Sequence, residues 1–173
     1  MNDTPDLKKS GWSVKRISIL VIFIALSAVG SLVKIPSPLG AIGLDACPGY
    51  FSALAFGYVE GAIIIAIGHL LTGLIVGFPM TLPIHMGVAV CMAICAIVFR
   101  FFGIKLLKGK IGLVAAVVVG SLLNSFGGGL MTLFIGGWGL YFAVLPSLLI
   151  GSAVNTIIAA IAFFAVRNSK LLN

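Results

Sequence analysis

The sequence predicts an all-α membrane protein with six transmembrane helices. Three observations lead to this prediction: the composition, the length of the charge-free segments and the placement of the basic residues. Of the 173 residues, 61% are hydrophobic and 9% are charged, whereas soluble domains are about 45–50% apolar and about 25% charged. So few charges cannot cover a soluble surface, and we expect one integral membrane domain over residues 1–173, with no separate soluble catalytic domain.

The charge-free segments give the number of spans. A helix needs about 20 apolar residues to cross the hydrocarbon core, and Gly77–Pro83 contains two prolines that end one span. The charge-free segment Ile111–Val166 is too long for one crossing, and the glycine-rich stretch Gly127–Gly139 divides it. After a cytoplasmic tail at residues 1–13, the predicted spans are approximately 14–33, 46–59, 61–77, 84–102, 111–128 and 140–166.

The basic residues predict the orientation. With both termini in the cytoplasm, ten of the eleven lysines and arginines lie on the cytoplasmic side, in the two tails and the 100–110 loop, and only Lys34 lies outside. This arrangement agrees with the positive-inside rule. Long uncharged stretches separate the basic clusters, which argues against a continuous nucleic-acid-binding face.

The three outer segments, Lys34–Phe51, Gly77–His85 and Gly127–Tyr141, are not hydrophilic. They contain proline, glycine and aromatic residues with a few isolated polar groups. We expect them to fold back as a lid over a cavity between the helix ends. Ordinary tight apolar turns are the alternative.

Polar side chains within the spans are few, and an unpaired polar group in hydrocarbon costs several kcal/mol, so they should face a cavity or a neighbouring helix. Asp45 could accept hydrogen bonds from a ligand or complement a helix dipole, and Asn155 could bridge helices instead. Aromatic residues near the outer face could stack on a planar ligand or form an interfacial belt. The expected ligand-binding residues are Lys34, Ser37, Asp45, His69, Phe78, His85, Asn124, Trp138, Tyr141 and Asn155.

Several kinds of chemistry have no motif here. Cys47, Cys91 and Cys95 are too few and too apolar in context for a disulfide framework or a metal site. The chain has no phosphate-binding G-x-x-x-x-G-K-[ST] loop, no H-E-x-x-H and no G-x-S-x-G. We therefore expect no catalytic residues, cofactor or metal, and a binding subunit that depends on partners.

The segment Ile35–Phe51 (IPSPLGAIGLDACPGYF), followed by Glu60–Gly61, Gly68–Leu70 and Gly77–Pro79, resembles the substrate-binding (S) components of energy-coupling factor (ECF) vitamin transporters. Among these it is most similar to the α-ribazole (cobalamin precursor) transporters. The resemblance implies an S-component-like bundle in the bacterial cytoplasmic membrane, which binds a vitamin from outside and associates with an ECF coupling protein and two ATPases.

The resemblance also implies a docking face. Family members contact the coupling protein through small residues, usually alanines, four apart on the first span. Here Ala25 pairs with Val29 and Ala28 with Leu32, so the alanine pattern is not met. The expected partner contacts are therefore Ser27, Gly30 and Ser31.

α-Ribazole is the ligand that the resemblance favours, with aromatic side chains against its ring and polar side chains on its ribose hydroxyls. A riboflavin-type or cobalamin-type vitamin would suit these residues almost as well. Two hypotheses from other classes stay open: a small membrane-embedded enzyme with His69 or His85 as general base, and an assembly subunit without a pocket.

Overall fold

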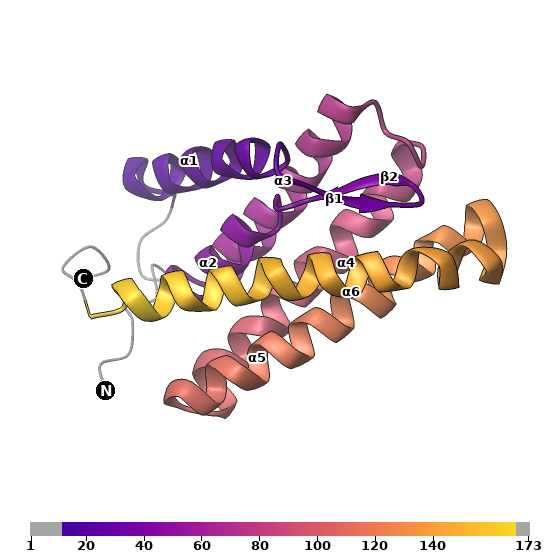
Figure 1. Ribbon diagram of the computed structural model, residues 1–173. Helices are drawn as coiled ribbons and strands as arrows, with labels where there is room; N and C mark the ends of the chain where they lie inside the picture. The colour runs from indigo at the N-terminus through magenta and orange to yellow at the C-terminus, as the bar shows by residue number, and fades with distance from the viewer. Residues whose placement is uncertain (1–11, 169–173) are drawn as a thin grey trace.

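The computed structural model describes residues 12–168, which form a helical bundle with one β-hairpin (Figure 1). The elements are α1 (Val14–Gly30), β1 (Lys34–Ser37), β2 (Gly40–Gly43), α2 (Cys47–Ala55), α3 (Tyr58–Val76), α4 (Leu82–Arg100), α5 (Gly109–Leu123) and α6 (Leu133–Val166). Two π-helical turns, at Phe101–Leu106 and Asn124–Gly128, extend α4 and α5. A short 3₁₀ turn, Leu130–Thr132, leads into α6.

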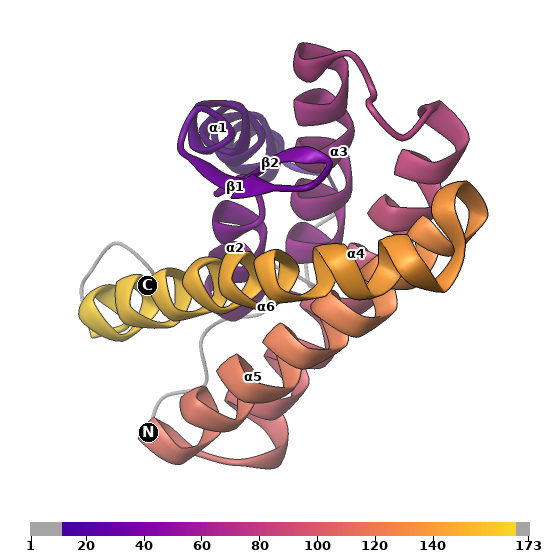
Figure 2. The same cartoon turned by 45° about the vertical axis from the view of Figure 1, so that its right-hand side comes forward.

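Three helical stretches of the described chain are long and apolar enough to cross a membrane: Tyr58–Val76, Leu82–Leu106 and Gly109–Val166. The last has 58 residues, and its backbone leaves helical geometry at Gly136 and Gly137, where φ of Gly137 is +60°. Beyond this kink α6 runs alongside α5 (Figures 1 and 2). α1 has 17 residues and α2 has nine, and neither is among the helices long enough to cross a membrane. The six crossings and the cytoplasmic position of the termini therefore stay predictions.

The β-hairpin is a difference from the all-α prediction. Lys34 pairs with Gly43 and Ser37 pairs with Gly40 in an antiparallel register, and Pro38 and Leu39 make the turn. Sequence reasoning missed these strands because proline and glycine are depleted in strands. Proline is tolerated here because a two-stranded sheet has only edge strands.

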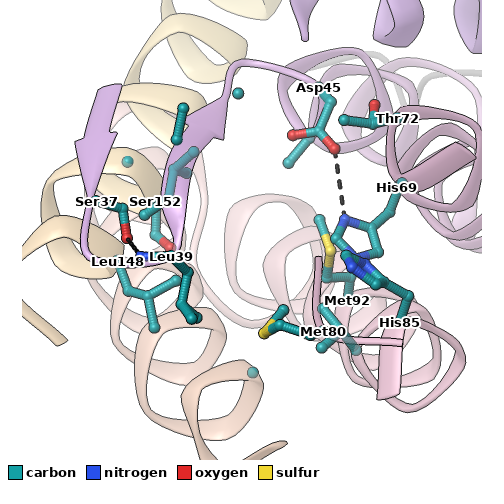
Figure 3. Close-up of a pocket in the computed structure, with 18 of the residues that line it drawn as sticks. Ser37, Leu39, Asp45, His69, Thr72, Met80, His85, Met92, Leu148 and Ser152 are labelled. Carbon is teal, nitrogen blue, oxygen red and sulfur yellow. Dashed lines mark hydrogen bonds and ion pairs between the residues drawn. The ribbon is translucent and has the colours of Figure 1, made fainter. Parts of the chain in front are cut away.

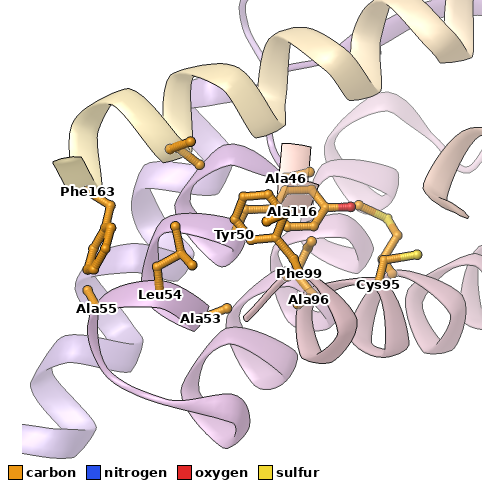
Figure 4. Close-up of a cluster of buried hydrophobic side chains, with 14 of the residues drawn as sticks. Ala46, Tyr50, Ala53, Leu54, Ala55, Cys95, Ala96, Phe99, Ala116 and Phe163 are labelled. Carbon is orange, nitrogen blue, oxygen red and sulfur yellow. The ribbon is translucent and has the colours of Figure 1, made fainter. Parts of the chain in front are cut away.

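Small residues bring α2 and α3 into close contact. A Cβ atom at Gly61 would overlap Ala53, and one at Gly49 would overlap Ile65. Helices embedded in lipid associate through this kind of close packing, because the surrounding hydrocarbon gives them no hydrophobic drive to associate. The ring of Tyr50 lies 4.9 Å from that of Phe99, centroid to centroid, in the centre of the core (Figure 4).

Two buried charged residues anchor the helix ends. Arg100 is 2% exposed, and its Nη1 donates hydrogen bonds to the carbonyl oxygens of Ala53 (2.6 Å) and Leu54 (2.8 Å). These carbonyls belong to the last turn of α2, which has no intrahelical partners for them. Glu60, in the first turn of α3, forms an ion pair with Arg16 of α1. Arg100, expected in a cytoplasmic loop, is thus a structural cap for the shortest helix.

We predict that Arg100→Met lowers the thermal stability of the detergent-solubilised protein. The substitution leaves two buried carbonyl groups without donors, and the expected loss is about 1.5–3 kcal/mol. The measurement is a thermal melt, with Lys108→Met as the control variant because it removes an exposed positive charge. Equal melting temperatures for the two variants would contradict this role.

Candidate functional site

A cavity lies between the hairpin, α3, α4 and α6 (Figure 3). Its interior has a volume of about 150 Å³, and the whole hollow, with the space at its open mouth, is about 950 Å³. The start of α2, the Val76–Leu82 connection and the π-helical turn Asn124–Gly128 complete its walls. Elements from both halves of the chain therefore converge on one space.

Six of the ten residues expected to bind a ligand line this cavity. They are Ser37, Asp45, His69, His85, Asn124 and Asn155. In Figure 3, Asp45, His69 and His85 lie on one wall, and Ser37 lies across the space from them. Whether any of them contacts a ligand stays a prediction.

Asp45, His69 and His85 form a chain of polar contacts along that wall. Asp45 Oδ2 lies 3.5 Å from His69 Nδ1, and His69 Nε2 lies 3.1 Å from His85 Nδ1. The tautomer of each imidazole decides which of these nitrogens donates and which accepts. The chain of contacts ends at His85 Nε2. Among the described residues, that buried nitrogen has no hydrogen-bond partner.

Asn155 makes three hydrogen bonds to the protein backbone. Its Oδ1 accepts a hydrogen bond from the Cys47 N–H (2.7 Å), and its Nδ2 donates to the carbonyls of Gly43 (3.2 Å) and Gly151 (2.9 Å). The side chain therefore joins β2, the start of α2 and α6. This matches the helix-bridging alternative, and Asn155 positions the cavity walls.

The opposite wall is held by hydroxyl and amide groups of α6 and its neighbours. Asn124 Nδ2 donates to Ser152 Oγ (2.8 Å), and Ser147 Oγ donates to Ser37 Oγ (3.2 Å). The second contact attaches the hairpin to α6 near the cavity. The hairpin is thus fixed over the cavity at two places, Ser37 and Gly43.

Sequence reasoning missed several lining residues. Thr72, Met80, Met92 and Ser152 all line the cavity, and Thr72 Oγ1 is buried with no hydrogen-bond partner in the described structure. Residues three apart share a helix face. Thr72 lies three residues after His69, and Ser152 lies three before Asn155, so this spacing could have identified both. The apolar methionines give no such signal.

Four expected ligand-binding residues are not among those that line the cavity. Lys34 is exposed at the start of β1. Phe78 packs edge-on against His85, with 5.3 Å between ring centroids, and covers Gly73. Trp138 is 61% exposed and packs edge-on against the buried Tyr141. The apolar lining is therefore mostly aliphatic side chains and methionines, without these aromatic rings.

The expected partner contacts on α1 face the protein itself. Ser27 is completely buried against Gly68 of α3, Ser31 is 3% exposed, and Gly30 lies against the Leu44 carbonyl. The exposed face of α1 instead includes Val21, Ala25 and Val29. Within residues 12–168, no group of three histidine, cysteine or acidic side chains could hold a metal ion.

Comparison with known proteins assigns the family. The family model for the ECF transporter substrate-specific component matches residues 15–167. The chain belongs to the ECF transporter S-component family. S components are transport subunits of the membrane and not enzymes; they bind small molecules and couple to an ECF module with ATPases.

Solved structures agree with the S-component fold. One, described as the S component of a bacterial ECF transporter, shares 17% identity at a TM-score of 0.59, covering 88% of this chain and 93% of its own. ThiT from Listeria monocytogenes shares 18% identity at a TM-score of 0.63, covering 88% of this chain and 97% of its own. At these identities the likeness shows the fold alone. The search of curated proteins found no significant match to this chain.

We predict that Asn155→Ala loosens the hairpin of this S component. The substitution leaves the Cys47 N–H and the Gly43 carbonyl without their partner, each worth about 1–3 kcal/mol when buried and unpaired. Hydrogen exchange at the Cys47 amide should accelerate and the melting temperature should fall. Ile158→Ala, at a position that is 41% exposed on the same helix, is the control. An unchanged hydrogen-exchange rate at the Cys47 amide would contradict the role of Asn155 in holding the hairpin.

Proposed function

We propose that this S component captures a vitamin or vitamin precursor that is heteroaromatic and carries no phosphate, and that the ligand is α-ribazole. The observation that carries the proposal is the charge of the cavity. Of the described residues that line it, Asp45 is the one carboxylate, and none is a lysine or arginine. A phosphate group would enter this space against a negative charge with no lysine or arginine to compensate it.

The polar wall suits a ligand with hydroxyl groups. Among the described residues, the Asp45 carboxylate has one polar side-chain partner, His69, at 3.5 Å, so it retains free lone pairs as an acceptor. His85 Nε2 and Thr72 Oγ1 are unpaired in the described structure. The ribose of α-ribazole presents hydroxyls that would donate to Asp45.

The remaining lining suits the ring. Met80 and Met92 lie on the cavity wall with Leu39 and Leu148 across from them (Figure 3). Thioether sulfur makes favourable contacts with aromatic rings and adapts to their outline. A dimethylbenzimidazole would therefore pack between methionine and leucine side chains, without the aromatic stacking that the sequence suggested. Another heteroaromatic vitamin, of riboflavin or cobalamin type, is the alternative ligand.

The proposal includes the topology and the partners. Six crossings with both termini in the cytoplasm place the hairpin and the cavity mouth on the outer side, where the nutrient arrives. An ECF coupling protein with two ATPases would supply the energy. The exposed strip of α1 formed by Val21, Ala25 and Val29, spaced four apart, is the surface of that helix open to a partner.

The functional test is growth. A bacterial strain that needs cobalamin and cannot make α-ribazole should grow on added α-ribazole only when this chain and an ECF module are both expressed. Growth without this chain would contradict the proposal. Rescue by other heteroaromatic vitamins in matched auxotrophs, with no rescue by α-ribazole, would reassign the ligand.

We predict that Asp45→Asn weakens α-ribazole binding to the purified protein. Loss of a charge-assisted hydrogen bond is worth about 1.5–3 kcal/mol, a rise in Kd of roughly 10- to 150-fold. Isothermal titration calorimetry measures it, with Lys34→Ala as a matched change of charge outside the cavity lining. If Asp45→Asn binds α-ribazole with wild-type affinity, Asp45 does not bind the ligand and its role is limited to the contact with His69.

A further inference from the structure

A second hollow lies on the outer surface of the bundle, between α5 and α6. It has a volume of about 400 Å³, or about 830 Å³ with the open space along its surface, and it shares no lining residue with the ligand cavity. Its walls include Leu113, Val117, Ile157, Ala160, Ile161 and Phe164. The two helices diverge toward the start of α5 and the end of α6 (Figures 1 and 2). Its apolar walls suit hydrocarbon chains.

One end of the groove is basic. Lys110 lines it, and its Nζ lies 5.6 Å from the centroid of the Phe164 ring. The guanidinium carbon of Arg167 lies 4.2 Å from the centroid of the same ring. Two cations, one from each helix end, therefore converge on a single aromatic ring where the groove meets the bundle end.

These two cations have no carboxylate partner in residues 12–168. The acidic side chains of this region are Asp45 and Glu60, which pair with His69 and Arg16. Lys110 also lies in the first turn of α5, where the helix dipole disfavours a positive charge. An external anion at this point would offset both charges and the dipole.

We propose that the α5–α6 groove binds an anionic phospholipid, with an acyl chain along the apolar walls and the phosphate between Lys110 and Arg167. The predicted orientation places this end at the cytoplasmic leaflet, where anionic headgroups attract basic residues near the membrane surface. The site takes a lipid from the surrounding bilayer and is independent of the vitamin.

The test is native mass spectrometry of the full chain, released from detergent with equal amounts of phosphatidylglycerol and phosphatidylcholine. The wild type should retain phosphatidylglycerol preferentially, and Lys110→Gln/Arg167→Gln should reduce that preference about thirtyfold, as expected for loss of two positive charges that attract the anionic headgroup. Lys105→Gln/Lys108→Gln removes two exposed charges outside the groove lining and should keep it. A thermal melt of each variant confirms folding.

A second variant tests the apolar part. Val114 lines the groove and is 64% exposed, so Val114→Trp should fill the space and reduce retention of both lipids while the protein stays folded. Equal retention of the two lipids by the wild type, or an unchanged preference in Lys110→Gln/Arg167→Gln, would overturn the proposal. So would lipid retention unaffected by Val114→Trp combined with loss of coupling-protein binding, which would make the groove a protein interface.

Discussion

Asn155 makes the contact on which the cavity depends. One side chain satisfies the Cys47 N–H and the carbonyls of Gly43 and Gly151, and so holds the hairpin, the start of α2 and the middle of α6 together. In hydrocarbon no water can replace these hydrogen bonds. Gly151 permits the approach, since a Cβ atom there would lie 2.7 Å from Ile42. The hairpin side of the cavity is therefore fixed by hydrogen bonds from one polar side chain inside an apolar bundle.

The same constraint separates two kinds of polar group. Asn155 and Arg100 direct hydrogen bonds to backbone groups that would otherwise be unpaired, and they serve the structure. Asp45, His69 and His85 contact one another along the cavity wall, and His85 Nε2 has no hydrogen-bond partner among the described residues. Since unpaired buried polar atoms are costly, a ligand that supplies hydrogen bonds there would be recognised by its pattern of donors. This division links the fold to the proposed specificity.

The sequence predicted the helical membrane fold and the family, and both are confirmed. The sequence also identified His69, Asn124 and Asn155 as residues of the cavity lining, because an isolated polar residue in an apolar helix has to face inward. It did not predict the hairpin, since Pro36 and Pro38 disfavour strands. The sequence placed aromatic residues near the outer face but did not show which way their side chains point. Trp138 follows the kink at Gly136–Gly137 and is 61% exposed. Ser27 was read as a surface contact because a small residue fits an external partner as well as it fits Gly68.

The central claim is that a cavity lined by one carboxylate, with no lysine or arginine among its described lining residues, selects a heteroaromatic ligand without a phosphate. Calorimetric titration of the purified protein with α-ribazole and, separately, with α-ribazole 5′-phosphate tests it most directly. The account predicts one-to-one binding of α-ribazole and at least about tenfold weaker binding of the phosphate, a difference of roughly 1.4 kcal/mol. Equal or tighter binding of the phosphorylated compound would contradict it.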